Sequence, residues 1–341
     1  MNARRRRPLI PRPRVASRTA LAGAAALGVL GLTACGTGTG GGSGGEEVNV
    51  VASFYPMRFI AEEVGGKHVT VDTLTKPGVE AHDLELSPRQ IAELGEADLV
   101  VYLKGFQPAV DKAVEQSGVE HVAEAGSYTE LEERGSGHEH EHAGEHEGHD
   151  HGEHAGEHEG HDHGHGEDAV DPHVWLDPVK YAEIAEGVGE ALAKADPDHA
   201  ADYRENAKAL AAKLDDLDAD FREGLKNRRT DTFITTHSAF GYLAERYGLH
   251  EEAIAGLDPE SEPSGARMKE LHEIAEEDEV NTVFFETAAS DRTARTFADD
   301  LGLRTDVLDP IEGIGENSRG DDYLQVMRAN LQALRKALGA E

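Results

Sequence analysis

The fold is decided by residues 198–226, which read DHAADYRENAKALAAKLDDLDADFREGLK. Large apolar side chains recur in this stretch at spacings of seven, four, three, four and four residues, namely Tyr203, Leu210, Leu214, Leu217, Phe221 and Leu225. Such spacings place them on one face of a helix. At 1.5 Å per residue, a helix of about 29 residues spans roughly 43 Å. We expect it to join two lobes as a rigid strut, because its heptads are too few to favour the alternative, a coiled-coil dimer.

Strands and helices alternate on both sides of this helix. Before it, the pattern predicts strands at 48–52, 68–74 and 98–103 and helices at 57–64, 88–95 and 178–194. After it, the pattern predicts strands at 232–236, 282–286 and 305–308 and helices at 239–247, 264–277, 291–301 and 323–338. This alternation indicates α/β structure with mostly parallel sheets. We therefore predict an N-terminal α/β lobe (48–197), one long linking helix (198–227) and a C-terminal α/β lobe (228–341).

The first 34 residues are typical of a lipoprotein signal peptide. A basic stretch, 1–18, precedes an apolar run, 19–32, that falls short of the roughly 20 residues needed to span a bilayer. The run ends in Leu32-Thr33-Ala34-Cys35, which resembles a bacterial lipobox in which Cys35 is lipidated and becomes the first mature residue. A plain secretory signal is the alternative, but Cys35 is the only cysteine and stands where lipidation needs it. With a flexible Gly/Thr/Ser-rich tether at 35–47, this predicts anchoring to the outer face of the cytoplasmic membrane.

The charge balance excludes several classes of protein. The chain of 341 residues has 33 Lys and Arg against 67 Asp and Glu, a formal net charge of −34. Seven of the bases lie in the predicted signal peptide, so the mature chain is more negative still. Such a chain is a poor candidate for nucleic-acid binding and should attract cations. The single cysteine rules out internal disulfides and a Cys-based zinc site, and 38% apolar residues do not suit a polytopic membrane protein. We expect a monomer.

A low-complexity segment, residues 138–165, interrupts the α/β pattern. The stretch 141–152 reads EHAGEHEGHDHG, and 153–164 repeats it letter for letter. With no large apolar residue to bury, the segment should be disordered without metal. We expect its 11 histidines to concentrate zinc near the main site as weak auxiliary ligands, although a solvated insert without a role in transport is the alternative. They are His138, His140, His142, His146, His149, His151, His154, His158, His161, His163 and His165.

Three other histidines occupy loops of one kind. His82 lies in GVEAHDLELSP (78–88), His173 in DPHVWLDP (171–178) and His237 in TTHSAF (235–240), each after a predicted strand or before a predicted helix. In open α/β sheets, ligands bind outside the carboxyl ends of the strands. A lone histidine most often has a structural role, but three on such loops, two in one lobe and one in the other, favour a shared site. We expect a structural role for the remaining five, which are His68, His121, His199, His250 and His272.

At these motifs the chain resembles the zinc-binding solute receptors of ABC importers, the ZnuA/TroA-like group of metal-binding lipoproteins (cluster A-I). Further matching stretches are Glu262-Pro263-Ser264, Phe284-Phe285-Glu286-Thr287 and Asp306-Val307-Leu308-Asp309-Pro310, and the resemblance covers about 48–340 in one collinear order. It implies two lobes joined by a long helix, with a metal in the cleft bound by His82, His173 and His237. It also implies a carboxylate of the second lobe as fourth ligand. Asp309 matches best by position, with Glu286 or a water as alternatives.

The resemblance and the ligand chemistry point to the same metal. Manganese members of the group usually place a glutamate where His237 stands, so the histidine implies zinc. Three imidazoles and one carboxylate also suit tetrahedral Zn²⁺, whereas Mn²⁺ prefers oxygen ligands and higher coordination. We therefore predict a zinc receptor that delivers Zn²⁺ to an ABC permease in the membrane, and not an enzyme. The alternatives are a receptor for manganese or another divalent metal, a surface adhesin or metal buffer, and a zinc hydrolase, against which no HExxH motif appears in any predicted helix.

Overall fold

The computed structural model describes residues 47–132, 170–287 and 291–340. The predicted signal peptide, the lipidation site Cys35, nearly all of the predicted tether and the His-rich segment 138–165 lie outside the described residues. Residues 46–341 form one compact unit. Among the described residues, no helix combines the length and hydrophobicity that crossing a membrane requires.

Two four-stranded parallel sheets form the framework, in the strand orders β2-β1-β3-β4 and β6-β5-β7-β8. The first contains β1 (Val48–Ala52), β2 (Val69–Thr73), β3 (Leu99–Tyr102) and β4 (Val122–Glu124), and the second β5 (Thr232–Thr235), β6 (His250–Ala253), β7 (Thr282–Phe285) and β8 (Arg304–Val307). This confirms the predicted α/β class with parallel sheets. The edge strands β4 (VAE) and β6 (HEEA) were not predicted, because they are short and lack an apolar pattern.

The helices lie close to the predicted ranges. They are α1 (Tyr55–Gly65), α2 (Pro88–Gly95), α3 (Pro108–Ser117), α4 (Pro178–Ala195), α5 (Ala200–Gly224), α6 (Gly241–Tyr247), α7 (Gly265–Glu277), α8 (Arg292–Leu301) and α9 (Tyr323–Leu338). The long helix α5 has 25 residues, fewer than the pattern predicted, because Pro197–His199 form a separate 3₁₀ turn and Leu225 caps the helix. The sequence pattern had left α3 unpredicted.

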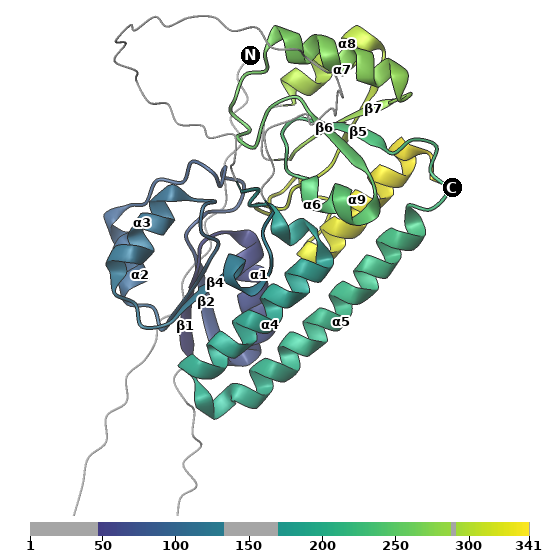
Figure 1. Ribbon diagram of the computed structural model, residues 1–341. Coiled ribbons are helices and arrows are strands. Elements are labelled where there is room, and N and C mark those ends of the chain that lie inside the picture. Colours follow the sequence, from purple (N-terminus) through teal and green to yellow (C-terminus); the bar gives the residue numbers. More distant parts are fainter. Residues whose placement is uncertain (1–46, 133–169, 288–290, 341) are drawn as a thin grey trace, which may run out of the picture. The chain divides into compact units, whose positions relative to one another are not determined.

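Each sheet is covered by helices on both faces, and the two lobes share a core. In β1, Val50 and Ala52 pack into the cluster that contains the apolar face of α5, whereas Val51 packs into a separate cluster with α2 and α3. In the second sheet, Phe233 joins the shared cluster, while Ile234 faces the cluster that contains residues of α7 and α8. Helices α4 and α5 lie side by side (Figure 1), and α5 also packs against α9. Helix α5 thus joins the lobes through a continuous core, which favours small movements between them.

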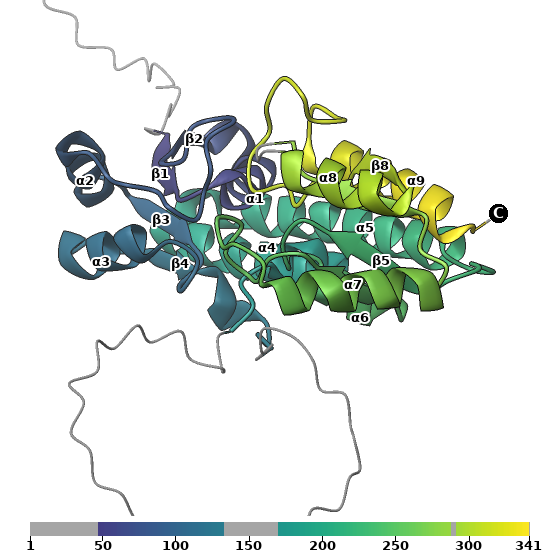
Figure 2. The same cartoon turned by 90° about the horizontal axis from the view of Figure 1, so that it is seen from above.

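The loops that follow the strands hold the functional motifs. His82 lies between β2 and α2, and His173 lies just before the 3₁₀ helix η3 (Val174–Leu176) that leads into α4. His237 follows β5, and the loop 308–322 follows β8. Both sheets present these loops at the carboxyl ends of their strands, where ligands bind in open α/β sheets. Figure 2 shows the same elements from above, with α7 and α8 on the second lobe.

Candidate metal centre

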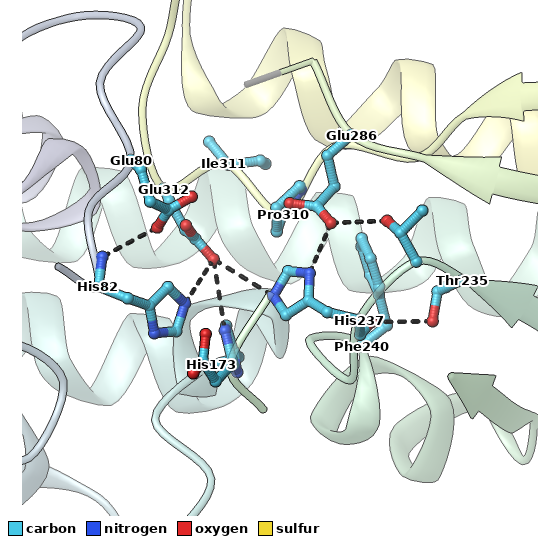
Figure 3. A network of polar contacts seen from close by, with 12 residues as sticks. Glu80, His82, His173, Thr235, His237, Phe240, Glu286, Pro310, Ile311 and Glu312 are labelled. Atoms are coloured by element: carbon cyan, nitrogen blue, oxygen red, sulfur yellow. Dashed lines mark hydrogen bonds and ion pairs between the residues drawn. The ribbon is translucent and has the colours of Figure 1, made fainter. Parts of the chain in front are cut away.

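Four side chains from four separate loops meet between the two sheets. His82, His173, His237 and Glu312 each offer one ligand atom, and these atoms all lie within 4.8 Å of one another. Within the described ranges 47–132, 170–287 and 291–340 this is the one group of three or more such residues that could hold a metal ion. Figure 3 shows the three imidazoles turned toward the carboxylate of Glu312. The sequence-predicted histidines are therefore brought together by the fold.

The carboxylate of Glu312 lies at the centre of the group. Its Oε1 lies 3.2 Å from Nε2 of His82, 3.4 Å from Nε2 of His173 and 3.6 Å from Nε2 of His237. The Nε2 atoms of His173 and His237 are buried and have no hydrogen-bond partner. A buried polar atom without a partner costs roughly 1–3 kcal/mol. A cation bound among the four side chains would remove this cost.

The opposite ring nitrogens of two histidines are fixed by carboxylates. Nδ1 of His173 donates to Asp171 at 2.8 Å, and Nδ1 of His237 donates to Glu286 at 2.6 Å. Because an ionised carboxylate only accepts, each Nδ1 carries the hydrogen and each Nε2 offers its lone pair to the centre when the ring is neutral. Metal-binding histidines commonly have such a carboxylate partner, which fixes the ring and its tautomer. Asp171 and Glu286 thus prepare two rings to bind a metal through Nε2.

The charges of the group stabilise one another in the absence of metal. Burial lowers the pKa of His173, but the carboxylates of Asp171 and Glu312 outweigh burial and raise this pKa to about 9. Burial also lowers the pKa of His237. The carboxylates of Glu286 and Glu312 outweigh burial, so the pKa of His237 lies well above the ordinary value. Burial raises the pKa of Glu312, but the nearby rings of His173, His237 and His82 bring this pKa well below the usual range. At neutral pH the metal-free group therefore holds a carboxylate beside protonated imidazoles.

A bound metal must displace these protons, which predicts a pH dependence. Below a pKa of about 9, His173 is protonated in the metal-free protein, so the affinity for Zn²⁺ should fall as the pH falls. The expected loss between pH 8 and pH 6 is about tenfold per pH unit for each displaced proton. Competition titrations at several pH values measure the slope, and calorimetry in buffers of different ionisation enthalpy counts the protons released. An affinity that stays constant over this range would contradict the arrangement of charges.

The structure brings Glu312, and not Asp309, into the group that could hold a metal. Asp309, the residue favoured by position, lies outside the group of four, because its carboxylate accepts hydrogen bonds from Thr287 Oγ1 at 2.9 Å and from the N–H of Ile311 at 2.8 Å. Glu286, the alternative, binds the far side of the His237 ring. Asp309 instead shapes a turn in which Ile311 has φ +60°, and this turn directs Glu312 into the centre.

The five histidines for which a structural role was expected lie outside this group. Nε2 of His68 donates to the carboxylate of Asp202 at 2.7 Å, and the His68 ring stacks on His199 with 3.9 Å between ring centroids. His272 packs edge-on against Phe297. Trp175 is buried beside His173, with 5.2 Å between ring centroids, and its indole N–H donates to the carbonyl of Pro310. Trp175 therefore ties the loop of His173 to the loop of Glu312.

Comparison with known proteins was made against a family model, curated sequences and solved structures. Residues 50–337 match the model of the zinc-uptake complex component A, periplasmic. The high-affinity zinc uptake system protein ZnuA of Bacillus subtilis is 38% identical over 316 residues, which cover 90% of this chain and 93% of that protein. The zinc-binding lipoprotein AdcA of Streptococcus pneumoniae is 34% identical over 86% of this chain, which spans 56% of the length of AdcA.

Solved structures give the same picture of the fold. The Zn(II)-bound structure of AdcA aligns with a TM-score of 0.68 at 32% identity, over 86% of this chain and 58% of AdcA. The laminin-binding protein Lmb of Streptococcus agalactiae, described as bifunctional with adhesin and metal-transporting activity, aligns with a TM-score of 0.71 at 29% identity, over 86% of this chain and all of Lmb. With the family model matched over most of its length, the chain belongs to the ZnuA family of zinc-uptake receptors.

Proposed function

We propose that this protein binds Zn²⁺ through His82, His173, His237 and Glu312 and delivers it to an ABC permease in the cytoplasmic membrane. The observation that carries the proposal is the convergence of three imidazole Nε2 atoms on one buried carboxylate. Membership of the zinc-uptake family supports both the cargo and the partner. The names of the relatives, a zinc uptake protein and a zinc-binding lipoprotein, agree with it.

The donor set favours zinc capture over other metals and over catalysis. Three nitrogens and one oxygen match tetrahedral Zn²⁺, whereas Mn²⁺ would need more oxygen ligands. Catalytic zinc sites commonly have three protein ligands and keep the fourth position for an activated water. Here Glu312 would fill that position, so the group suits a receptor that holds and releases its cargo.

Two further features support a position at the membrane. We infer that Cys35 is lipidated and anchors the protein to the outer face of the cytoplasmic membrane, and that the protein acts as a monomer. The lipobox-like sequence before Cys35 and the name of the lipoprotein AdcA support the anchor. A receptor held beside its permease need not diffuse away after it has captured an ion.

A deletion separates the two proposed metal-binding parts. The variant that lacks residues 138–165 should retain one tightly bound Zn²⁺ per chain, because the four central ligands lie outside that segment. Only the weak additional binding of the full chain should disappear. Metal content after dialysis gives the stoichiometry, and competition with a zinc chelator gives the affinity. Loss of tight binding in the deletion variant would instead indicate a metal buffer that works through its His-rich segment.

A further inference from the structure

His82 is more exposed than the other three ligands, and its ring has fewer contacts that fix its direction. Its side chain is 15% exposed, against 0% for His173, 1% for His237 and 7% for Glu312. Carboxylates hold Nδ1 of His173 and of His237, but in the described part of the chain no carboxylate forms an ion pair with Nδ1 of His82. The direction of the His82 ring therefore depends more on the loop that carries it than do those of the His173 and His237 rings.

That loop has few contacts of its own. Residues 76–79 are exposed, and Gly78 adopts φ +72°. The backbone is bound to β1 only at the start of the loop, where the N–H groups of Leu74 and Thr75 donate to Ala52 and Ser53. Ala81, just before His82, is fully buried. The position of the Ala81–His82 peptide thus decides whether His82 points at the metal.

Gln107, the residue just before α3, fixes this peptide from outside the loop. It follows β3, is 1% exposed, and its Nε2 donates to the carbonyl of Ala81 at 2.8 Å and to Thr75 Oγ1 at 2.9 Å. One amide group therefore uses both hydrogens to join the start of the loop to its buried end. The N–H of His82, on the same peptide, donates to Glu80 at 2.9 Å. Beside Gln107, the ring of Phe106 packs edge-on against His82, with 4.6 Å between centroids.

We propose that Gln107 is a positioning residue for zinc binding, which holds His82 on the metal and so sets the rate at which zinc leaves. The inference rests on the proposed zinc-binding function. Because His173, His237 and Glu312 are buried and His173 and His237 are each held by a carboxylate, His82 is the ligand that detaches first. Without Gln107, the Ala81 carbonyl loses its donor and the His82 loop can separate from the centre more often.

Stopped-flow dissociation of zinc into excess chelator tests this role. Gln107→Leu, which keeps a side chain of similar volume but donates no hydrogen bond, should raise the dissociation rate at least about tenfold with little change in the association rate. The matched control is Asn281→Leu, which removes an amide that donates to the carbonyl of Ala337, outside the metal group. Asn281→Leu should leave both rates unchanged.

A double-mutant comparison separates positioning from a general loss of structure. In a His82→Ala background, Gln107→Leu should change the dissociation rate less than about twofold, because the residue it positions is gone. An equal acceleration in both backgrounds, or none in the wild-type background, would overturn the proposal. If Gln107→Leu fails to fold, Gln107→Met replaces it, since a thioether keeps the size but cannot donate to Ala81. A failure of the proposed function would show itself separately, as an absence of tight zinc binding in the wild-type chain.

Discussion

Replacing His237 with alanine is expected to weaken zinc binding at least about a hundredfold. His237 is 1% exposed, and its Nε2 is one of the four donor atoms that meet in the group. Structural zinc sites in small peptides gain about 10–16 kcal/mol from metal binding, and on that scale one ligand of four carries about 3 kcal/mol. Since each 1.4 kcal/mol is a factor of ten, the loss should be about a hundredfold or more. Competition with a chelator of known zinc affinity measures it.

The control for this variant is another histidine of the same lobe. His272 lies on α7 and packs against Phe297, outside the group of four. His272→Ala should therefore bind zinc as tightly as the wild-type protein. If His237→Ala loses less than about tenfold, or if His272→Ala loses as much as His237→Ala, zinc is bound elsewhere in the chain.

Glu312→Gln is expected to weaken zinc binding about as much as His237→Ala. Comparison with Asp309→Asn then tests which carboxylate binds the metal. The substitution keeps the shape of the side chain but removes the charge that faces three imidazoles at 3.2–3.6 Å. We expect about a hundredfold loss of zinc affinity from this change. Asp309→Asn is the matched variant, because it makes the same chemical change three residues earlier, in a side chain that binds Thr287 and the N–H of Ile311.

Asp309→Asn should lower the affinity less than about tenfold, because its remaining carbonyl oxygen can still accept one of these hydrogen bonds. Both variants are measured by the same chelator competition, with thermal unfolding of the metal-free proteins as a check on folding. If Asp309→Asn lowered the zinc affinity more than Glu312→Gln, this would indicate that Asp309, and not Glu312, binds the metal.

Much of the fold could be predicted from the sequence, for identifiable reasons. The apolar face of α5 is plain in the sequence because Leu210, Leu214, Leu217 and Phe221 recur at helical spacing, and all four are buried in the shared core. Strands β4 and β6 were not predicted, since β4 has only three residues and the four residues of β6 are too polar to show a pattern. Strand β6 is held in the sheet by parallel pairing with β5, which its own sequence does not indicate.

The site was predictable only in part. The three histidines stand in motifs beside strand ends or helix starts, so sequence position alone indicates a common site. Glu312 gives no such signal, because it lies in a glycine-containing loop whose direction depends on the turn at 309–311. In that turn Ile311 has φ +60°, which β-branched residues rarely adopt and which no sequence pattern predicts. Similarly, the contact of Gln107 with Ala81 joins positions 26 residues apart, and it becomes visible only once the fold brings the start of α3 beside the loop after β2.

The most direct test of the central claim is anomalous diffraction at the zinc absorption edge from crystals of the zinc-loaded protein. We predict one strong peak between the two lobes, with Nε2 of His82, His173 and His237 and a carboxylate oxygen of Glu312 at about 2.0–2.2 Å. The four donor atoms already lie within 4.8 Å of one another, so only small shifts of the lobes and loops would bring them to these distances from the zinc ion. A peak bound by Asp309 in place of Glu312, or a zinc ion held away from the three histidines, would contradict the account.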